Sequence, residues 1–126
     1  MLYDYTEMQF TDELLGKEVL PQHVERAEQG LYAFAKRLGV PQNDVIRGYL
    51  ADELVQLYTY RFVCFDKAYA LPGAYTREGS TDDFYSKKLL YLDERIKILE
   101  KQITPEDLTG DAKKYARYRT VEIYRG

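Results

Sequence analysis

The sequence predicts a mainly α-helical fold: a bundle of three or four helices with a long central helix and a short C-terminal β-strand. Three observations support this prediction. Apolar residues recur with helical spacing in three stretches of the chain. Turn signals that contain glycine and proline separate those stretches. Only the last residues alternate between apolar and polar side chains with the period of two that is typical of a strand.

The chain has the size and composition of one globular domain. It has 126 residues, of which 45% are hydrophobic and 31% charged. We therefore expect a single helical domain over residues 1–126, in which residues 111–126 form an extended tail or strand. The net charge of −3 provides no overall basic surface for nucleic acid or anionic membranes. No signal peptide or membrane-length apolar run is visible, so we expect a cytoplasmic protein without a membrane partner.

The first forty residues predict two helices. A short helix is expected over Thr6–Leu15, with Asp4 or Thr6 as its cap and with Phe10, Leu14 and Leu15 on one face. A second helix is expected from Pro21 to about Leu38, with Gly39 as its stop signal. Its apolar stripe consists of Val24, Ala27, Leu31, Phe34 and Leu38.

The middle of the chain predicts the long central helix, from Pro41–Asp44 to about Ala70. Its apolar residues surround most of the helix, as in a helix covered by several neighbours; they are Val45, Ile46, Tyr49, Leu50, Leu54, Leu57, Tyr58, Val63, Cys64, Phe65 and Ala68. A polar loop follows, and Thr81 or Asp82 is expected to cap the next helix. That helix has the clearest repeat in the chain, made of Tyr85, Leu89, Leu92, Ile96, Leu99 and Ile103. Thr104-Pro105 predicts one more short helix, which ends before Gly110.

The residues that could perform catalysis are few and scattered. Cys64 lies in an apolar run and is expected to be buried and unreactive. His23 is the only histidine, and we expect it on the surface. The sequence contains no nucleophile elbow, phosphate-binding loop or dinucleotide-binding motif. We therefore predict a protein that is not an enzyme and needs no cofactor or metal; the opposite hypothesis depends only on scattered pairs of carboxylates.

The C-terminal residues are the candidate interaction site. Residues 119–125 alternate as a lone strand, which needs a backbone partner in Leu2–Tyr5 or in another chain. The candidate interaction residues are Tyr115, Arg117, Tyr118, Arg119, Val121, Ile123, Tyr124 and Arg125. Tyrosine and arginine at these positions fit a protein interface, a nucleic-acid strand, or a merely solvated tail. The 13 tyrosines of the chain leave a similar choice open between interface residues and residues at the edge of the core.

One segment carries a resemblance to a known family. The segment Asp52–Arg61, which contains Leu57, Tyr58 and Arg61, resembles the Leu-Tyr-x-x-Arg portion of the second main helix in phage head–tail connector (adaptor) proteins. The order of the predicted elements over residues 6–103 is also similar, whereas residues 104–126 have no counterpart. The resemblance implies a non-catalytic virion subunit that forms rings under the portal.

These observations together predict a structural assembly protein that forms a homo-oligomer or binds a protein partner. The alternative is a small helical regulatory or nucleic-acid-binding module that uses the basic, tyrosine-rich tail.

Overall fold

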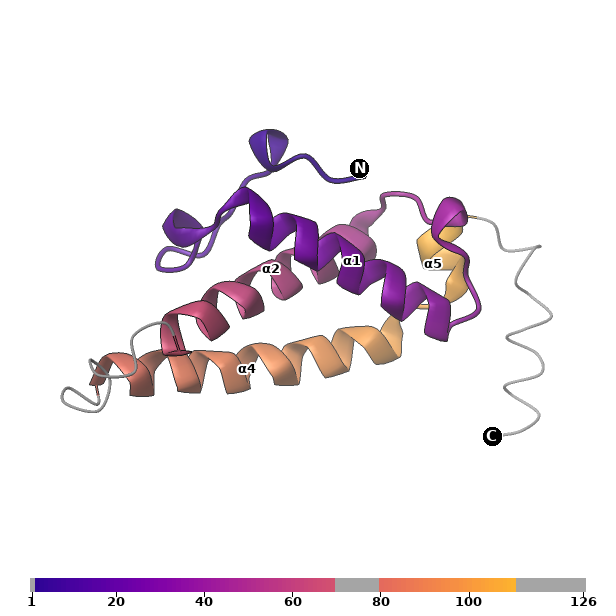
Figure 1. Cartoon of the computed structure of the whole chain (residues 1–126). Helices are drawn as coiled ribbons and strands as arrows, with labels where there is room; N and C mark the ends of the chain where they lie inside the picture. Colours follow the sequence, from indigo (N-terminus) through magenta and orange to yellow (C-terminus); the bar gives the residue numbers. More distant parts are fainter. Residues whose placement is uncertain (1, 70–79, 111–126) are drawn as a thin grey trace.

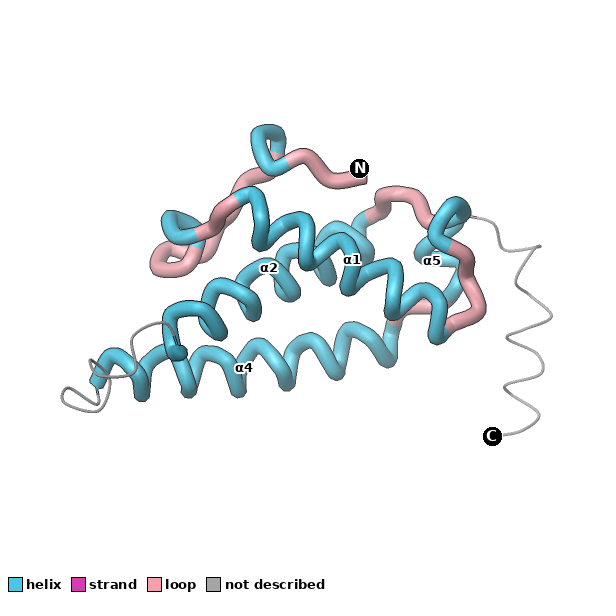
Figure 2. Tube along the Cα trace, viewed as in Figure 1, coloured by secondary structure: helices cyan, strands magenta, loops and turns pink. Residues whose placement is uncertain are grey.

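The computed structural model describes residues 2–69 and 80–110, and these residues form a mainly helical body (Figure 1). The α-helices are α1 (Pro21–Arg37), α2 (Tyr49–Tyr69), α4 (Ser80–Gln102) and α5 (Pro105–Thr109). Three short 3₁₀ helices, η1 (Tyr5–Glu7), η2 (Gly16–Glu18) and η3 (Gln42–Asp44), lie in the connections (Figure 2). The helical prediction is confirmed. The predicted C-terminal strand lies outside the described residues.

Helix α2 occupies the centre of the arrangement, as predicted for the long central helix. Helix α1 packs against one side of α2, and α4 packs along another side (Figure 1). Helix α4 runs antiparallel to α2, because Arg61 pairs with Asp93 whereas the earlier Tyr58 pairs with the later Glu100. No helix in residues 2–69 or 80–110 is long and apolar enough to cross a membrane.

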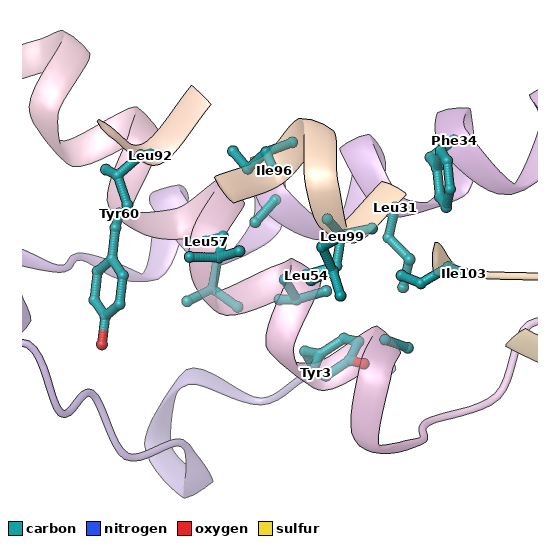
Figure 3. Packing of buried hydrophobic residues seen from close by; sticks show 14 of the residues in the cluster. Tyr3, Leu31, Phe34, Leu54, Leu57, Tyr60, Leu92, Ile96, Leu99 and Ile103 are labelled. Carbon is teal, nitrogen blue, oxygen red and sulfur yellow. The ribbon is translucent and has the colours of Figure 1, made fainter. Parts of the chain in front are cut away.

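The hydrophobic core lies between the three long helices (Figure 3). The predicted stripes of α1 and α4 point into this core, which confirms both repeats. Its buried members include Val24, Ala27, Leu31 and Phe34 from α1, Leu54 and Leu57 from α2, Leu92, Ile96 and Leu99 from α4, and the adjoining Ile103. Burial of these side chains supplies the main favourable contribution to folding.

Several predicted helix ends are confirmed. Gly39, after α1, has a φ of 83°, a conformation that favours glycine. Thr104 begins α5 with a capping box, in which its N–H donates to the Asp107 carboxylate and the Asp107 N–H donates to the Thr104 hydroxyl. Gly110 ends α5 with a φ of 70°.

The predicted helix over Thr6–Leu15 is wrong. The Asp4 carboxylate accepts a hydrogen bond from the Thr6 N–H at 3.0 Å, and the Asp12 carboxylate accepts one from the Leu15 N–H at 2.8 Å. Such local bonds compete with helix formation. The chain therefore forms short turns here, and Leu14 is 61% exposed although Leu15 is fully buried.

The predicted start of the central helix is also wrong. Only η3 forms near Pro41, and α2 begins at Tyr49. The intervening Ile46 N–H donates to the carbonyl of Leu108 at 2.8 Å, a contact that ties this connection to α5. Three residues assigned to the apolar face of this helix are instead exposed: Ile46 at 47%, Tyr49 at 83% and Phe65 at 48%. Helix α4 also begins earlier than predicted, so Thr81 and Asp82 lie within its first turn.

Candidate protein-docking cleft

A cleft with a volume of about 750 Å³ lies between α1 and α4, with α2 as its floor. Its lining residues are Gly30, Ala33 and Arg37 from α1, Tyr58, Arg61 and Phe62 from α2, and Leu90, Asp93, Glu94, Ile96, Lys97 and Glu100 from α4. A second hollow of about 700 Å³ shares Gly30 and Phe62 with it and continues past Glu25, Arg26 and Gln29. We call the two hollows together the α1–α4 cleft.

The shape of the cleft follows from small residues on α1. A Cβ atom at Gly30 would lie 3.3 Å from the Tyr58 ring, so this glycine allows α1 to approach α2 closely. One turn later, the exposed Ala33 adds little bulk to the same wall. The helices α1 and α4 therefore both pack on α2 while space remains between them.

Five polar residues that line the cleft bind one another; they are Arg37, Tyr58, Arg61, Asp93 and Glu100. The Tyr58 hydroxyl donates to the Glu100 carboxylate, which also lies 3.6 Å from Arg37. Arg61 donates to Asp93 at 2.6 Å. Burial, and then the bond to Glu100, raise the pKa of Tyr58, so its phenol stays protonated and acts as a donor at neutral pH. These contacts tie the α2 floor to both walls of the cleft.

The apolar part of the cleft is open to solvent. Phe62 is half-buried in the floor, and Leu90 on the α4 wall is 67% exposed. Ala33 faces the same space from α1. Exposure of apolar surface in a concave site is typical of a place where another protein binds.

The expectation that His23 lies on the surface is wrong, because the residue is 3% exposed. Its Nδ1 accepts a hydrogen bond from the Leu20 N–H at 2.9 Å, and its Nε2 lies 2.8 Å from an Asp66 oxygen. Since Nδ1 is an acceptor, Nε2 must carry the proton that is donated to Asp66. Both nitrogens are therefore occupied, one in capping α1 and the other in binding Asp66 of α2.

Glu28 is a buried carboxylate that sequence reasoning missed. It is 1% exposed and accepts hydrogen bonds from the N–H groups of Leu2 and Tyr3 and from the Tyr32 hydroxyl. Burial alone would raise the pKa of Glu28, but these bonds outweigh burial and lower it. Its position, four residues after Val24 and three before Leu31, places it on the apolar stripe and is the signal that could have revealed it.

The described tyrosines include residues at the edge of the core and residues exposed to solvent. Five use their hydroxyls at the edge of the core: Tyr3 donates to Asp52, Tyr5 to the Val19 carbonyl, Tyr32 to Glu28 and Tyr58 to Glu100, while Tyr60 accepts from the Asp12 N–H. Two others, Tyr49 and Tyr91, are exposed. In this part of the chain, most tyrosines therefore complete the core.

The other residues that the sequence analysis considered for catalysis, metal binding or interaction are described in turn. Cys64 is fully buried, as predicted, and burial raises its pKa to about 11. The adjacent carboxylates of Asp52 and Glu53 diverge, one toward Tyr3 and the other toward Arg95. No group of three metal-ligating side chains occurs within the described ranges. The candidate interaction residues between Tyr115 and Arg125 lie outside those ranges.

The predicted internal partner of the C-terminal strand does not form a strand. The N–H groups of Leu2 and Tyr3 are both bound to Glu28, so they are not available to a second strand.

No protein-family model, curated protein or solved structure matches this chain, so any inference about its function depends on its own residues and geometry.

Proposed function

We propose that this chain is a non-catalytic assembly protein whose α1–α4 cleft binds a helical segment of another protein subunit. One observation carries the proposal: an open cleft in which the exposed Ala33 and Leu90 and the half-buried Phe62 lie beside the Arg61–Asp93 and Arg37–Glu100 pairs. Binding of an amphipathic helix in a groove uses an apolar floor of this kind, with polar groups along the rim.

The dimensions of the cleft support a short helix as the ligand. The α1 wall extends from Glu25 to Arg37, twelve residues apart, which corresponds to about 18 Å along a helix. A helix of about three turns has this length. The rim residues Arg26 and Glu94 supply charges of opposite sign on the two walls, as a helix with a mixed polar face would require.

The more specific proposal is a subunit of a phage head–tail connector. It is supported by the resemblance of Leu57, Tyr58 and Arg61 to the connector pattern, and two of these residues, Tyr58 and Arg61, line the cleft. In such an assembly, residues 119–125 would add a strand to a sheet of a neighbouring subunit. The neighbouring genes test this proposal: portal, terminase or tail genes would support it, and a set of unrelated metabolic genes would count against it.

The assembly role is tested by measuring mass in solution with light scattering and sedimentation, from micromolar to near-millimolar protein. We expect the full chain to associate and the variants Ala33→Glu and Leu90→Glu to associate less, because each places a charge on the apolar wall. The matched control is Leu14→Glu, since Leu14 is 61% exposed but lies outside the cleft. A chain that remains monomeric, with unchanged amide exchange in α1 and α4 at every concentration, would contradict the proposal.

A nucleic-acid-binding module is the second candidate. It is supported by five cations, Lys113, Lys114, Arg117, Arg119 and Arg125, which are interleaved with tyrosines in the tail. Titration with single- and double-stranded DNA tests it: binding should weaken steeply with salt and disappear when the chain ends at Gly110. Absence of binding at low salt would exclude this candidate.

A further inference from the structure

A separate hollow, of about 490 Å³, lies between the N-terminal segment and the first turns of α1. Two tyrosines, a proline and a valine make most of its wall apolar, and the complete lining is Tyr3, Asp4, Tyr5, Thr6, Pro21, Val24 and Glu25. It shares Glu25 with the α1–α4 cleft. We call it the N-terminal hollow.

The surroundings of the N-terminal hollow are acidic. Asp4 and Glu25 line it and are exposed, and no lysine or arginine is among its described lining residues. Residues 2–25 as a whole carry six carboxylates and one lysine. An apolar hollow with carboxylates at its rim suits a lysine or arginine side chain, because such a side chain can bury its carbon stem while its charge stays near the surface.

The Tyr5 ring is fixed in the wall of the hollow. Its hydroxyl donates to the Val19 carbonyl at 3.0 Å, and the ring centroid lies 5.9 Å from that of Phe10. The side chain is only half-buried, so part of it stays accessible. Because these contacts orient the ring before any ligand arrives, a cation that stacks on it costs little additional ordering of the tyrosine.

We propose that the N-terminal hollow binds the chain's own C-terminal segment Lys113–Arg119 through lysine and arginine side chains. Charge complementarity supports this occupant, because residues 111–126 carry five lysines and arginines but only two carboxylates. Four of these five cations lie within Lys113–Arg119, together with two tyrosines. The contact uses side chains, so the N–H groups of Leu2 and Tyr3 keep their bonds to Glu28.

The C-terminal segment starts close to the N-terminal hollow. A Cβ atom at Gly110 would lie 3.2 Å from the side chain of Ile46. The next residue, Arg47, places its guanidinium carbon 5.1 Å from the centroid of the Tyr3 ring. Two neighbouring residues therefore connect Gly110 to the wall of the hollow. The sixteen residues after Gly110 can span up to about 50 Å, about twice the length of α1, so they are long enough to reach it.

The chain's own segment is favoured over the same segment of a second copy. Attachment through a few residues gives the segment an effective concentration in the millimolar range at the hollow. A second copy would match this only at near-millimolar protein. Ion pairs at an exposed rim are individually weak, so the contact depends on this high local concentration.

The contact regulates what the C-terminal segment can bind. While Lys113–Arg119 occupies the hollow, its cations are withheld from nucleic acids and from other subunits. A partner of the segment must displace it first, which lowers the apparent affinity by the fraction of chains in which the segment is free. The inference does not depend on the binding of a helix in the α1–α4 cleft.

Limited proteolysis of the full chain with trypsin tests the contact, because trypsin cuts after accessible lysine and arginine residues. Asp4→Asn combined with Glu25→Gln should raise the rate of cleavage after Arg117 and Arg119 about fivefold, since cleavage follows the population of the released segment. Asparagine keeps an oxygen that can accept the Thr6 N–H, so the turn at Asp4 is retained.

The matched control removes the same amount of charge elsewhere. Glu13→Gln combined with Glu94→Gln changes two exposed carboxylates that do not line the hollow, and should leave the cleavage rate unchanged. Thermal unfolding of both double variants checks that the fold is intact. Equal cleavage rates in the wild-type chain and in the Asp4→Asn, Glu25→Gln variant would overturn the proposal.

A spin label identifies which copy supplies the segment. A nitroxide attached to Val121→Cys modifies only the new thiol, because Cys64 is fully buried. In an isotope-enriched chain that carries the label, the amide signals of Tyr5 and Glu25 should broaden. Enriched chains without a label, mixed with labelled chains that are not enriched, should show no broadening. Broadening only in the mixture would assign the segment to a second copy and overturn the proposal, as would its absence from both samples.

The segment contact and the cleft can fail separately. Cleavage after Arg117 and Arg119 reports on the N-terminal hollow, whereas the mass of the Ala33→Glu and Leu90→Glu variants reports on association through the cleft. If the cleavage rates are equal but the cleft variants associate less, the segment contact fails and the assembly role stands. If the segment is protected in a chain that stays monomeric, the reverse conclusion follows.

Discussion

The two sides of α1 differ: the N-terminal segment covers one side, and the α1–α4 cleft lies along the other. Where α1 meets α2 on one side, the N-terminal segment, residues 2–20, covers the junction through the bonds of Leu2 and Tyr3 to Glu28 and of Tyr3 to Asp52. Toward α4, no described segment covers the junction between the two helices (Figure 1). The α1–α4 cleft lies there. One side is therefore closed by the chain itself, and the other is the side on which we propose that a partner binds.

The difference between the two sides comes from what their carboxylates bind. Glu28 accepts hydrogen bonds from backbone N–H groups, and this fixes a segment that has little regular secondary structure. In the cleft, Asp93 and Glu100 bind side chains of the cleft itself, Arg61 and Tyr58, so they hold no additional segment. A buried carboxylate aimed at backbone donors can thus close a junction that apolar packing alone leaves open.

Removal of Glu28 is expected to have the largest effect on the closed side. Glu28→Ala leaves two backbone N–H groups and the Tyr32 hydroxyl without their acceptor, and should lower the free energy of unfolding by about 3 kcal/mol. Urea denaturation measures this change. Glu25→Ala, on an exposed position of the same helix, should change the free energy by less than about 0.5 kcal/mol. Equal effects of the two variants would show that Glu28 does not hold the segment.

Acid should also release the N-terminal segment from α1, because protonation weakens the hydrogen bonds that the Glu28 carboxylate accepts. The effect should be smaller than that of Glu28→Ala. The pKa values of Glu28 and Asp12 are lowered in the folded chain, so each carboxylate stabilises the fold above its ordinary pKa. That stability is lost as the pH falls below the ordinary glutamate value of 4.5 and through the folded pKa. Thermal unfolding followed from neutral to acidic pH should show this decline in stability. In Glu28→Gln, the stability should depend less on pH.

The two hydrogen bonds of His23 are expected to stabilise the closed side at the start of α1. His23→Ala removes the acceptor of the Leu20 N–H and the donor to Asp66, and should cost about 1.5 kcal/mol in thermal or urea unfolding. His23→Gln should recover part of the loss, because a glutamine side chain at this position can accept the Leu20 N–H in place of Nδ1. No recovery in His23→Gln would indicate that the bond to Asp66, rather than the cap, supplies the stability.

The smallest effect on stability is expected on the open side. Leu90→Glu should change the free energy of unfolding by less than about 0.5 kcal/mol, because Leu90 is 67% exposed. Leu92→Ala, two residues away on the buried face of α4, should cost about 3 kcal/mol. If Leu90→Glu destabilised the fold as strongly as Leu92→Ala, the cleft wall would belong to the core rather than to a binding surface.

The accuracy of the sequence predictions follows the distance between interacting residues. The α1 and α4 stripes were predicted correctly, because a helical repeat depends on neighbours three and four residues away. The cap at Thr104 was also predicted correctly, because its partner Asp107 lies within the same turn. The burial of His23 was not predicted, because Asp66 lies 43 residues away. The cleft lining was not predicted either, because it joins three helices.

The sequence by itself determined the helical class, the core-facing stripes, and the glycine and threonine signals at the helix ends. Each of these depends on local periodicity or on the backbone preferences of one residue. Only the tertiary structure decided that Glu28 closes one side of α1, that α2 begins at Tyr49, and that the cleft stays open. The physical reason is that a buried carboxylate or an exposed leucine acquires its role from groups on other segments, which local sequence does not specify.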